Sequence, residues 1–152
     1  MKRLCATLLF LTLAASLTSC GSHESAYTML SEFITLYSAE GVIYSPECPE
    51  GTEGYIDTTT VSRIFILHGV MPENYAIFLN SHVDYGAECG VFVCRDAAER
   101  DEVIEMCEER MRLLSGGDNS LLLRSGNVVF YSTLRQRERA ETLWSKIIRS
   151  YT

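Results

Sequence analysis

One stretch, Gly90–Leu114, constrains the fold most, because an apolar strand pattern in it runs directly into a capped amphipathic helix. The strand is predicted at Gly90–Cys94, where β-branched and aromatic side chains make both faces apolar, so we expect a strand that is covered on both sides or lies at the centre of the sheet. Asp96, with Glu99 three residues later, forms a capping-box pattern that predicts the start of the helix. Apolar residues then recur at helical spacing along one face: Val103, Ile104, Cys107, Met111 and Leu114. A glycine pair at 116–117 predicts the end of this helix.

The chain before this unit is predicted to be mostly helical. Residues 26–39 show an apolar helix face, and residues 42–44 have the composition of a short strand. Residues 58–68 and 72–81 are interpreted as two short helices. A strand remains an alternative for both, because the first is rich in threonine and the second contains the apolar run Tyr75–Leu79.

The chain after this unit is predicted to form a hairpin and a final helix. Residues 120–124 and 127–132 have strand patterns joined by the turn signal Ser125-Gly126. Thr133, with Gln136 three residues later, repeats the capping-box pattern and predicts the start of the helix. Its predicted buried stripe consists of Ala140, Leu143, Trp144, Ile147 and Ile148.

The order strand, helix, hairpin, helix predicts an α+β fold. We expect a small, largely antiparallel sheet of about three strands with amphipathic helices packed on one face, and the N-terminal helices closing the remaining edge or face. The 152 residues can build one domain with a hydrophobic core, and we find no internal repeat or low-complexity tract. Residues 26–152 are therefore predicted to form a single domain.

The N-terminus has the pattern of an export signal. A basic start, Met1-Lys2-Arg3, precedes the apolar run Leu4–Leu17, which is shorter than the roughly 20 residues of a spanning helix. The run ends in Leu17-Thr18-Ser19-Cys20-Gly21, which resembles the lipobox of bacterial lipoproteins. Two alternatives remain open: a secretory signal cleaved near Ala14-Ala15-Ser16, or a short uncleaved anchor.

The lipobox resemblance implies a membrane-anchored protein outside the cytoplasm. Residues 1–19 would be a cleaved signal peptide, Cys20 would be the site of lipid attachment, and residues 20–25 would be a lipidated tether. Two or more acyl chains hold a protein stably on a membrane, whereas one chain holds it marginally. Loss of the leader would change the formal charge from −7 to −9, since it removes Lys2 and Arg3. Such an acidic chain repels phosphate backbones, so we exclude a nucleic-acid partner.

Four cysteines remain after the signal and the anchor: Cys48, Cys89, Cys94 and Cys107. Cys94 and Cys107 are both expected to face the core, so a disulfide between them is compatible with the predicted geometry. The alternative is that both are small buried free thiols. Cys89 and Cys48 are expected to be the least buried, and a thiol-dependent enzyme would use one of them.

Metal-binding and catalytic signatures are weak. The acidic loop with Glu47, Glu50, Glu53 and Asp57 could offer oxygen ligands to Ca²⁺, but its spacing matches no EF-hand, and Asp57 also fits as the cap of the 58–68 helix. No C-x-x-C pair, H-E-x-x-H, G-x-S-x-G or phosphate-binding loop occurs, and the three histidines show no ligand spacing. We therefore predict no metal, no catalytic residue and no cofactor.

A basic cluster lies at the predicted start of the last helix. Arg135, Arg137 and Arg139 could meet an anionic wall polymer or lipid headgroups. The alternative is a solvated face on which these arginines pair with Glu138 and Glu141.

Several of these segments together are similar to a family of small Firmicute, mostly clostridial, lipoproteins that is defined only as a domain of unknown function. The similarity rests on the lipobox, on Ala87–Cys94, on the long helix containing Arg110, and on Ser125–Phe130, and it covers roughly residues 55–148. It implies a Gram-positive cell-surface lipoprotein with an α+β domain, and it implies no activity.

These patterns favour a cell-surface lipoprotein with a non-enzymatic domain that binds a protein or another envelope component. The membrane is the first expected partner, through the lipid on Cys20. Two alternatives remain open: a carrier of a small ligand or metal, and a thiol-dependent enzyme.

Overall fold

The computed structural model describes residues 25–65, 72–80, 87–114 and 117–151. Its helices are α2 (Ala26–Tyr37), α3 (Thr58–Phe65), α4 (Ala97–Leu113) and α5 (Arg137–Ile148), with a short 3₁₀ turn, η1, at Gly117–Asn119. Its strands are β1 (Gly41–Tyr44), β2 (Asn74–Asn80), β3 (Glu88–Val93), β4 (Leu121–Ser125) and β5 (Val128–Ser132). None of the helices within these ranges is long and apolar enough to cross a bilayer.

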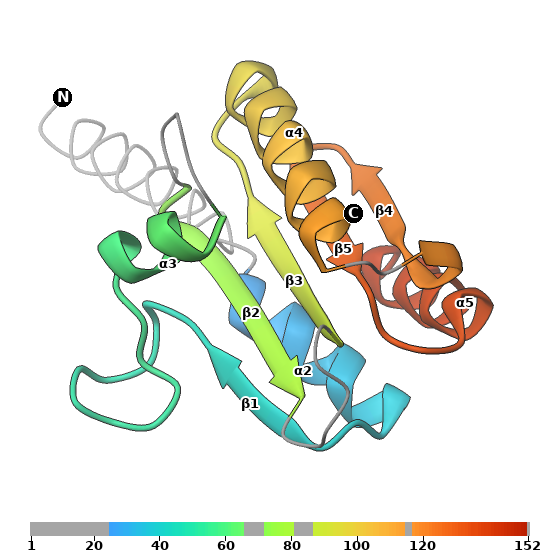
Figure 1. The fold of residues 1–152 in the computed structure, drawn as a ribbon, viewed down its shortest axis with the longest axis horizontal. Helices are drawn as coiled ribbons and strands as arrows, with labels where there is room; N and C mark the ends of the chain where they lie inside the picture. The colour runs from blue at the N-terminus through green and yellow to red at the C-terminus, as the bar shows by residue number, and fades with distance from the viewer. Residues whose placement is uncertain (1–24, 66–71, 81–86, 115–116, 152) are drawn as a thin grey trace, which may run out of the picture.

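The strands form one open sheet in the order β1-β2-β3-β5-β4, and every neighbouring pair is antiparallel (Figure 1). The α+β class is therefore confirmed, but the sheet has five strands rather than about three. β3 lies in the middle, as its two apolar faces predicted. Phe92 and Cys94 lie in one core cluster, and Val91 and Val93 lie in or against the other.

Helices cover both faces of the sheet (Figure 1), and α4 and α5, which were expected on the same face, lie on opposite ones. α2 and α5 pack on one face around Phe33, Phe130 and Trp144. α3 and α4 pack on the other face around Phe65 and Phe92. The central strands have no polar face, and burying both sides requires a helix layer on each.

β2 is the main element that the sequence prediction assigned wrongly. The preferred helix at residues 72–81 is a strand, which was the alternative. Tyr75 and Ile77 enter the α3–α4 side of the core, while Ala76 and Phe78 enter the α2–α5 side. A short run that is apolar throughout fits a buried strand and a buried helix equally well, so periodicity alone cannot separate them.

The helix starts show which capping patterns were correct. Asp96 accepts the N–H of Glu99 at 2.9 Å, as predicted. In a capping box the Glu99 side chain would accept the N–H of Asp96, but here it accepts the N–H of the preceding residue, Arg95, at 2.6 Å. Asp57 accepts the N–H of Thr60 at 2.8 Å and starts α3. The predicted ends of these two helices near His68 and at the 116–117 glycine pair lie partly or wholly outside the described residues.

The predicted cap of the last helix is wrong. α5 begins at Arg137, and its N-cap Gln136 has a left-handed backbone with φ 61° and no side-chain capping bond. The Thr133 hydroxyl instead accepts the N–H of Glu88 at 3.0 Å and donates to the Glu88 carbonyl at 3.2 Å. Thr133 therefore joins β3 to the segment after β5 and is not placed to cap the helix.

Candidate functional site

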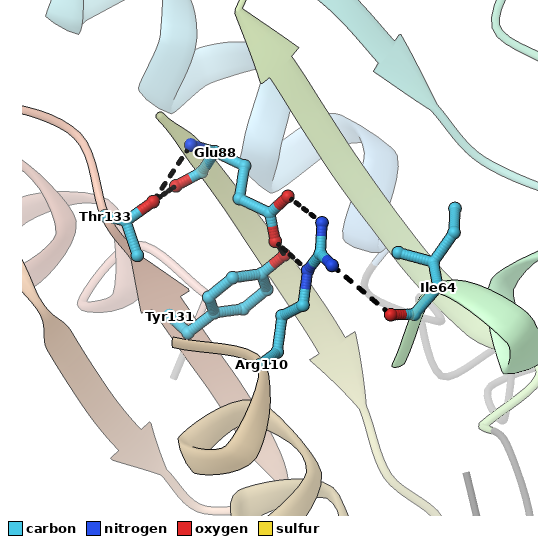
Figure 2. Close-up of polar contacts among 5 residues, drawn as sticks. All are labelled: Ile64, Glu88, Arg110, Tyr131 and Thr133. Carbon is cyan, nitrogen blue, oxygen red and sulfur yellow. Dashed lines mark hydrogen bonds and ion pairs between the residues drawn. The ribbon is translucent and has the colours of Figure 1, made fainter. Parts of the chain in front are cut away.

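The most polar part of the core is a contact between Glu88 of β3 and Arg110 of α4 (Figure 2). The guanidinium donates to both carboxylate oxygens, at 2.8 Å from Nε and 2.7 Å from Nη2. Tyr131 of β5 donates its hydroxyl to the same carboxylate at 2.7 Å. The side chain of Glu88 is 3% exposed and that of Arg110 is 19% exposed, so both charges are largely removed from water. We call Glu88, Arg110 and Tyr131 the buried triad.

Strand register explains why these three residues meet. Gly90 pairs with Tyr131 across β3 and β5, and Glu88 lies two residues before Gly90 on the same face of the sheet. A Cβ at Gly90 would lie 2.5 Å from the Tyr131 ring, so only glycine leaves room for this ring to lie over the strand and reach Glu88. Arg110 completes the contact from α4, with its guanidinium 5.7 Å from the centroid of the Phe65 ring.

The electrostatics of the buried triad favour an ion pair beside a neutral phenol. Hydrogen bonding to Glu88 raises the pKa of Arg110 above its usual value. Burial, followed by the nearby Glu88 charge, raises the pKa of Tyr131 well above its usual value. In the described part of the chain, every buried side-chain polar atom has a hydrogen-bond partner. A contact that is fully satisfied in this way offers no unpaired group to a substrate.

The cysteines lie deeper than the sequence suggested. Cys89 is 0% exposed, so the prediction that it is among the least buried is wrong. Burial raises the pKa values of Cys89 and Cys107 well above the usual value, and it raises that of Cys94 to about 12. A thiol of this kind is rarely ionised at neutral pH and is a poor nucleophile. Cys48, in the loop after β1, is half-buried.

Cys94 and Cys107 lie in the same core cluster, as expected. Both are free thiols in the structure, as are Cys48 and Cys89. The disulfide between Cys94 and Cys107 therefore stays a prediction beside its alternative, a pair of buried free thiols.

We expect alkaline pH to lower the free energy of unfolding, because the buried thiols ionise more readily in the unfolded chain than in the folded one. The pKa of Cys94 is about 12 in the folded chain against an ordinary value of 9.0, so its contribution to stability is complete below pH 9 and is lost as pH rises toward 12. Urea unfolding under reducing conditions at pH 8 and pH 10.5 should show a lower free energy of unfolding at the higher pH. The Cys94→Ala variant should lose less between the two pH values than the wild type, and equal losses would contradict this account.

The acidic loop is engaged in contacts within the chain. Glu47 accepts the hydroxyl of Ser25 at 2.6 Å, and Asp57 caps α3. Within the described ranges, no three His, Cys, Asp or Glu side chains gather as they would around a metal ion. The predicted lipid site Cys20 and all three histidines lie outside the described residues.

The described surface has a hollow of about 370 Å³ at one end of the sheet. We call it the end groove. It lies between the C-terminal end of α2, the end of β2, the start of β3 and the segment leading into α5, all of which meet at the same end of the sheet. Its walls include Tyr37, Glu40, Asn80, Arg135, Gln136 and Arg139. The volume is within the range of small-ligand sites.

The end groove contains two of the three arginines that the sequence singled out. Arg139 donates to the Leu36 carbonyl at 3.4 Å, and its guanidinium lies 5.1 Å from the centroid of the Tyr37 ring. The predicted pairing with Glu138 and Glu141 does not occur for Arg137 or Arg139, since no ion pair in the described part of the chain involves them.

No local pattern in the sequence pairs Glu88 with Tyr131, although a glutamate bordering an apolar strand is a signal that it needs a buried partner. No local pattern places Tyr37 beside Arg139 either, because the two lie about a hundred positions apart. Comparison with protein-family models, with curated proteins and with solved structures finds no match to this chain.

Proposed function

We propose that this chain is an extracytoplasmic, lipid-anchored protein of the bacterial cell envelope whose domain binds an envelope component without covalent chemistry. The observation that carries the proposal is the position of the end groove relative to the start of the domain. The N–H of Ala26 donates to the Asn74 side chain at 2.9 Å, which places the start of α2 beside the start of β2. The groove lies beside Asn80, at the other end of β2 and about 20 Å away at the usual strand rise.

The short tether limits how far the start of α2 can lie from a lipid on Cys20. Five residues lead from Cys20 to Ser25, and an extended chain of that length spans at most about 18 Å. A lipid on Cys20 would hold the start of α2 close to the membrane, and the end groove would open toward the far side of the domain. This arrangement favours a ligand in the envelope over the headgroups of the anchoring membrane.

The interior supports binding over catalysis. The buried triad is fully hydrogen-bonded, and three of the four thiols of the described chain lie in the core. Among the described residues, the buried triad and these three thiols therefore offer no exposed group for covalent chemistry. A small-ligand carrier is the second candidate, favoured by the volume of the end groove, and both candidates use the same surface.

The anchor is tested by the mass of the full chain expressed in a bacterium with its own leader. We expect detergent-extracted wild type to begin at Cys20 and to carry acyl groups, and the Cys20→Ala variant to carry none and to leave the membrane fraction. The Cys48→Ala variant is the matched control and should remain acylated. Alkylation without reductant in the same measurement counts the free thiols. A wild-type mass without acyl groups would refute the anchor.

The binding surface is tested on intact cells with a photo-crosslinking side chain at one position at a time. Gln136 lines the end groove, while Asp101 is exposed near the start of α4, toward the opposite end of the sheet. We expect an envelope component to be captured from position 136 and not from position 101. Equal capture from both positions, or capture from neither, would contradict the proposal.

A further inference from the structure

The end groove combines a cavity with a guanidinium that no carboxylate of the described chain neutralises. The Tyr37 hydroxyl donates to the Arg135 carbonyl, which holds the ring that lies under the Arg139 guanidinium. The ring fixes the guanidinium through a cation–π contact. One of the five N–H donors of Arg139 reaches the Leu36 carbonyl, and the other four have no acceptor among the described residues.

The same groove borders the start of α5, where backbone donors lack acceptors. Gln136, at the N-cap position, makes no side-chain capping bond, and Thr133, the residue expected to cap the helix, bonds to β3 instead. The first three N–H groups of the helix, those of residues 137–139, have no acceptor in the described part of the chain. The N-terminal end of a helix attracts anions through these groups and through the helix dipole.

The opposite wall of the groove has a different character. Glu40 and Asn80 line it, and their side chains carry oxygen atoms that accept hydrogen bonds. A bare anion would meet the Glu40 charge, whereas a phosphate ester of a polyol could place its phosphate toward Arg139 and its hydroxyls toward Glu40. Because the whole chain is acidic, long-range attraction of anions is weak and binding must rest on these short-range contacts.

We propose that the end groove is a binding site for a phosphate ester, whose phosphate is held by Arg139 together with the first-turn N–H groups of α5. The planar guanidinium matches two phosphate oxygens at once, which a lysine ammonium cannot do. This inference rests on the proposed function, since it names the chemistry that the same groove recognises.

Calorimetric titration of the full detergent-extracted chain tests the inference. The probes are inorganic phosphate, glycerol 3-phosphate, glycerol and a short-chain phosphatidylglycerol. We expect glycerol 3-phosphate to bind and glycerol not to bind. The Arg139→Gln variant should bind glycerol 3-phosphate at least about tenfold more weakly, because a charge-assisted hydrogen bond is lost. The Arg139→Lys variant should fall between the two.

The matched control is Arg149→Gln, which removes the same charge from an exposed site at the other end of α5 and should leave affinity within about twofold. Both arginines are exposed, so thermal unfolding should show that all variants fold. Phosphatidylglycerol binding that depends on Arg139 would identify a lipid as the source of the phosphate, and preference for glycerol 3-phosphate would identify a soluble ester.

Two results would overturn the inference: no binding of any phosphate probe to the wild type, or binding that Arg139→Gln leaves unchanged. Either result is separable from failure of the proposed function. If position 136 captures an envelope component while no phosphate binds, the groove recognises a different chemistry. If phosphate binds in the groove but no component is captured, the inference stands and the envelope role fails.

Discussion

Replacing Arg110 with methionine is expected to lower the free energy of unfolding by about 3–5 kcal/mol. The substitution keeps most of the apolar length of the side chain but leaves the Glu88 carboxylate buried beside one remaining partner, the Tyr131 hydroxyl. An uncompensated buried charge costs far more than the net value of the pair that it once formed. Urea unfolding followed by tryptophan fluorescence would measure the loss, because the chain has a single tryptophan.

Two further variants separate the buried charge from other effects. Arg112→Met removes an arginine two positions along the same helix, where it pairs with Glu109 on the surface at 3.0 Å, and it should hardly change the unfolding midpoint. The double variant Glu88→Gln with Arg110→Met removes both charges and should be more stable than Arg110→Met alone. A double variant less stable than the single one would show that the unpaired carboxylate is not the cause of the loss.

Replacing Trp144 with alanine is expected to lower the free energy of unfolding by about 3–5 kcal/mol as well, through a different mechanism. Trp144 is 2% exposed and stacks on Phe130 with ring centroids 4.3 Å apart, and it contacts Phe33 edge-on. Its removal leaves a cavity where α2 and α5 meet the sheet. Chemical denaturation followed by circular dichroism would measure the loss, since the fluorescent residue is absent.

Lys146→Ala is the control for this core substitution. It shortens an exposed side chain on the same helix, two positions away, and should change stability little. A Trp144→Ala loss as small as that of the control would mean that α5 contributes little to the core.

Local patterns in the sequence were sufficient for the elements whose stabilising contacts are close in the chain. The Asp96 cap, the inward face of α4 and the hairpin of β4 and β5 all depend on residues within a few positions of one another. Their spacing alone therefore predicted the cap, the hairpin and the buried positions Val103, Cys107 and Met111 of α4, although it missed Met106, and Ile104 and Leu114 are only partly buried. The stripe on α5 was also correct, because alternation of buried and exposed positions along a helix is visible without its partners.

Distant contacts decided the rest. β2 is a strand because β1 and β3 satisfy its backbone hydrogen bonds on both sides, and its residues 74–80 carry no local signal strong enough to exclude a helix. Thr133 fails to cap α5 because Glu88, forty-five positions earlier, takes its hydroxyl. The candidate site follows the same rule, since the sequence showed the arginines of the basic cluster but not the Tyr37 ring beside Arg139.

The sequence by itself thus determined the α+β class and the central strand–helix unit, because each of these depends on residues that are neighbours in the chain. Only the tertiary structure decided the five-stranded order, the burial of Cys89, the Glu88–Arg110 pair and the end groove. Each of these joins residues from separate elements, and their distances and burial depend on how those elements pack together.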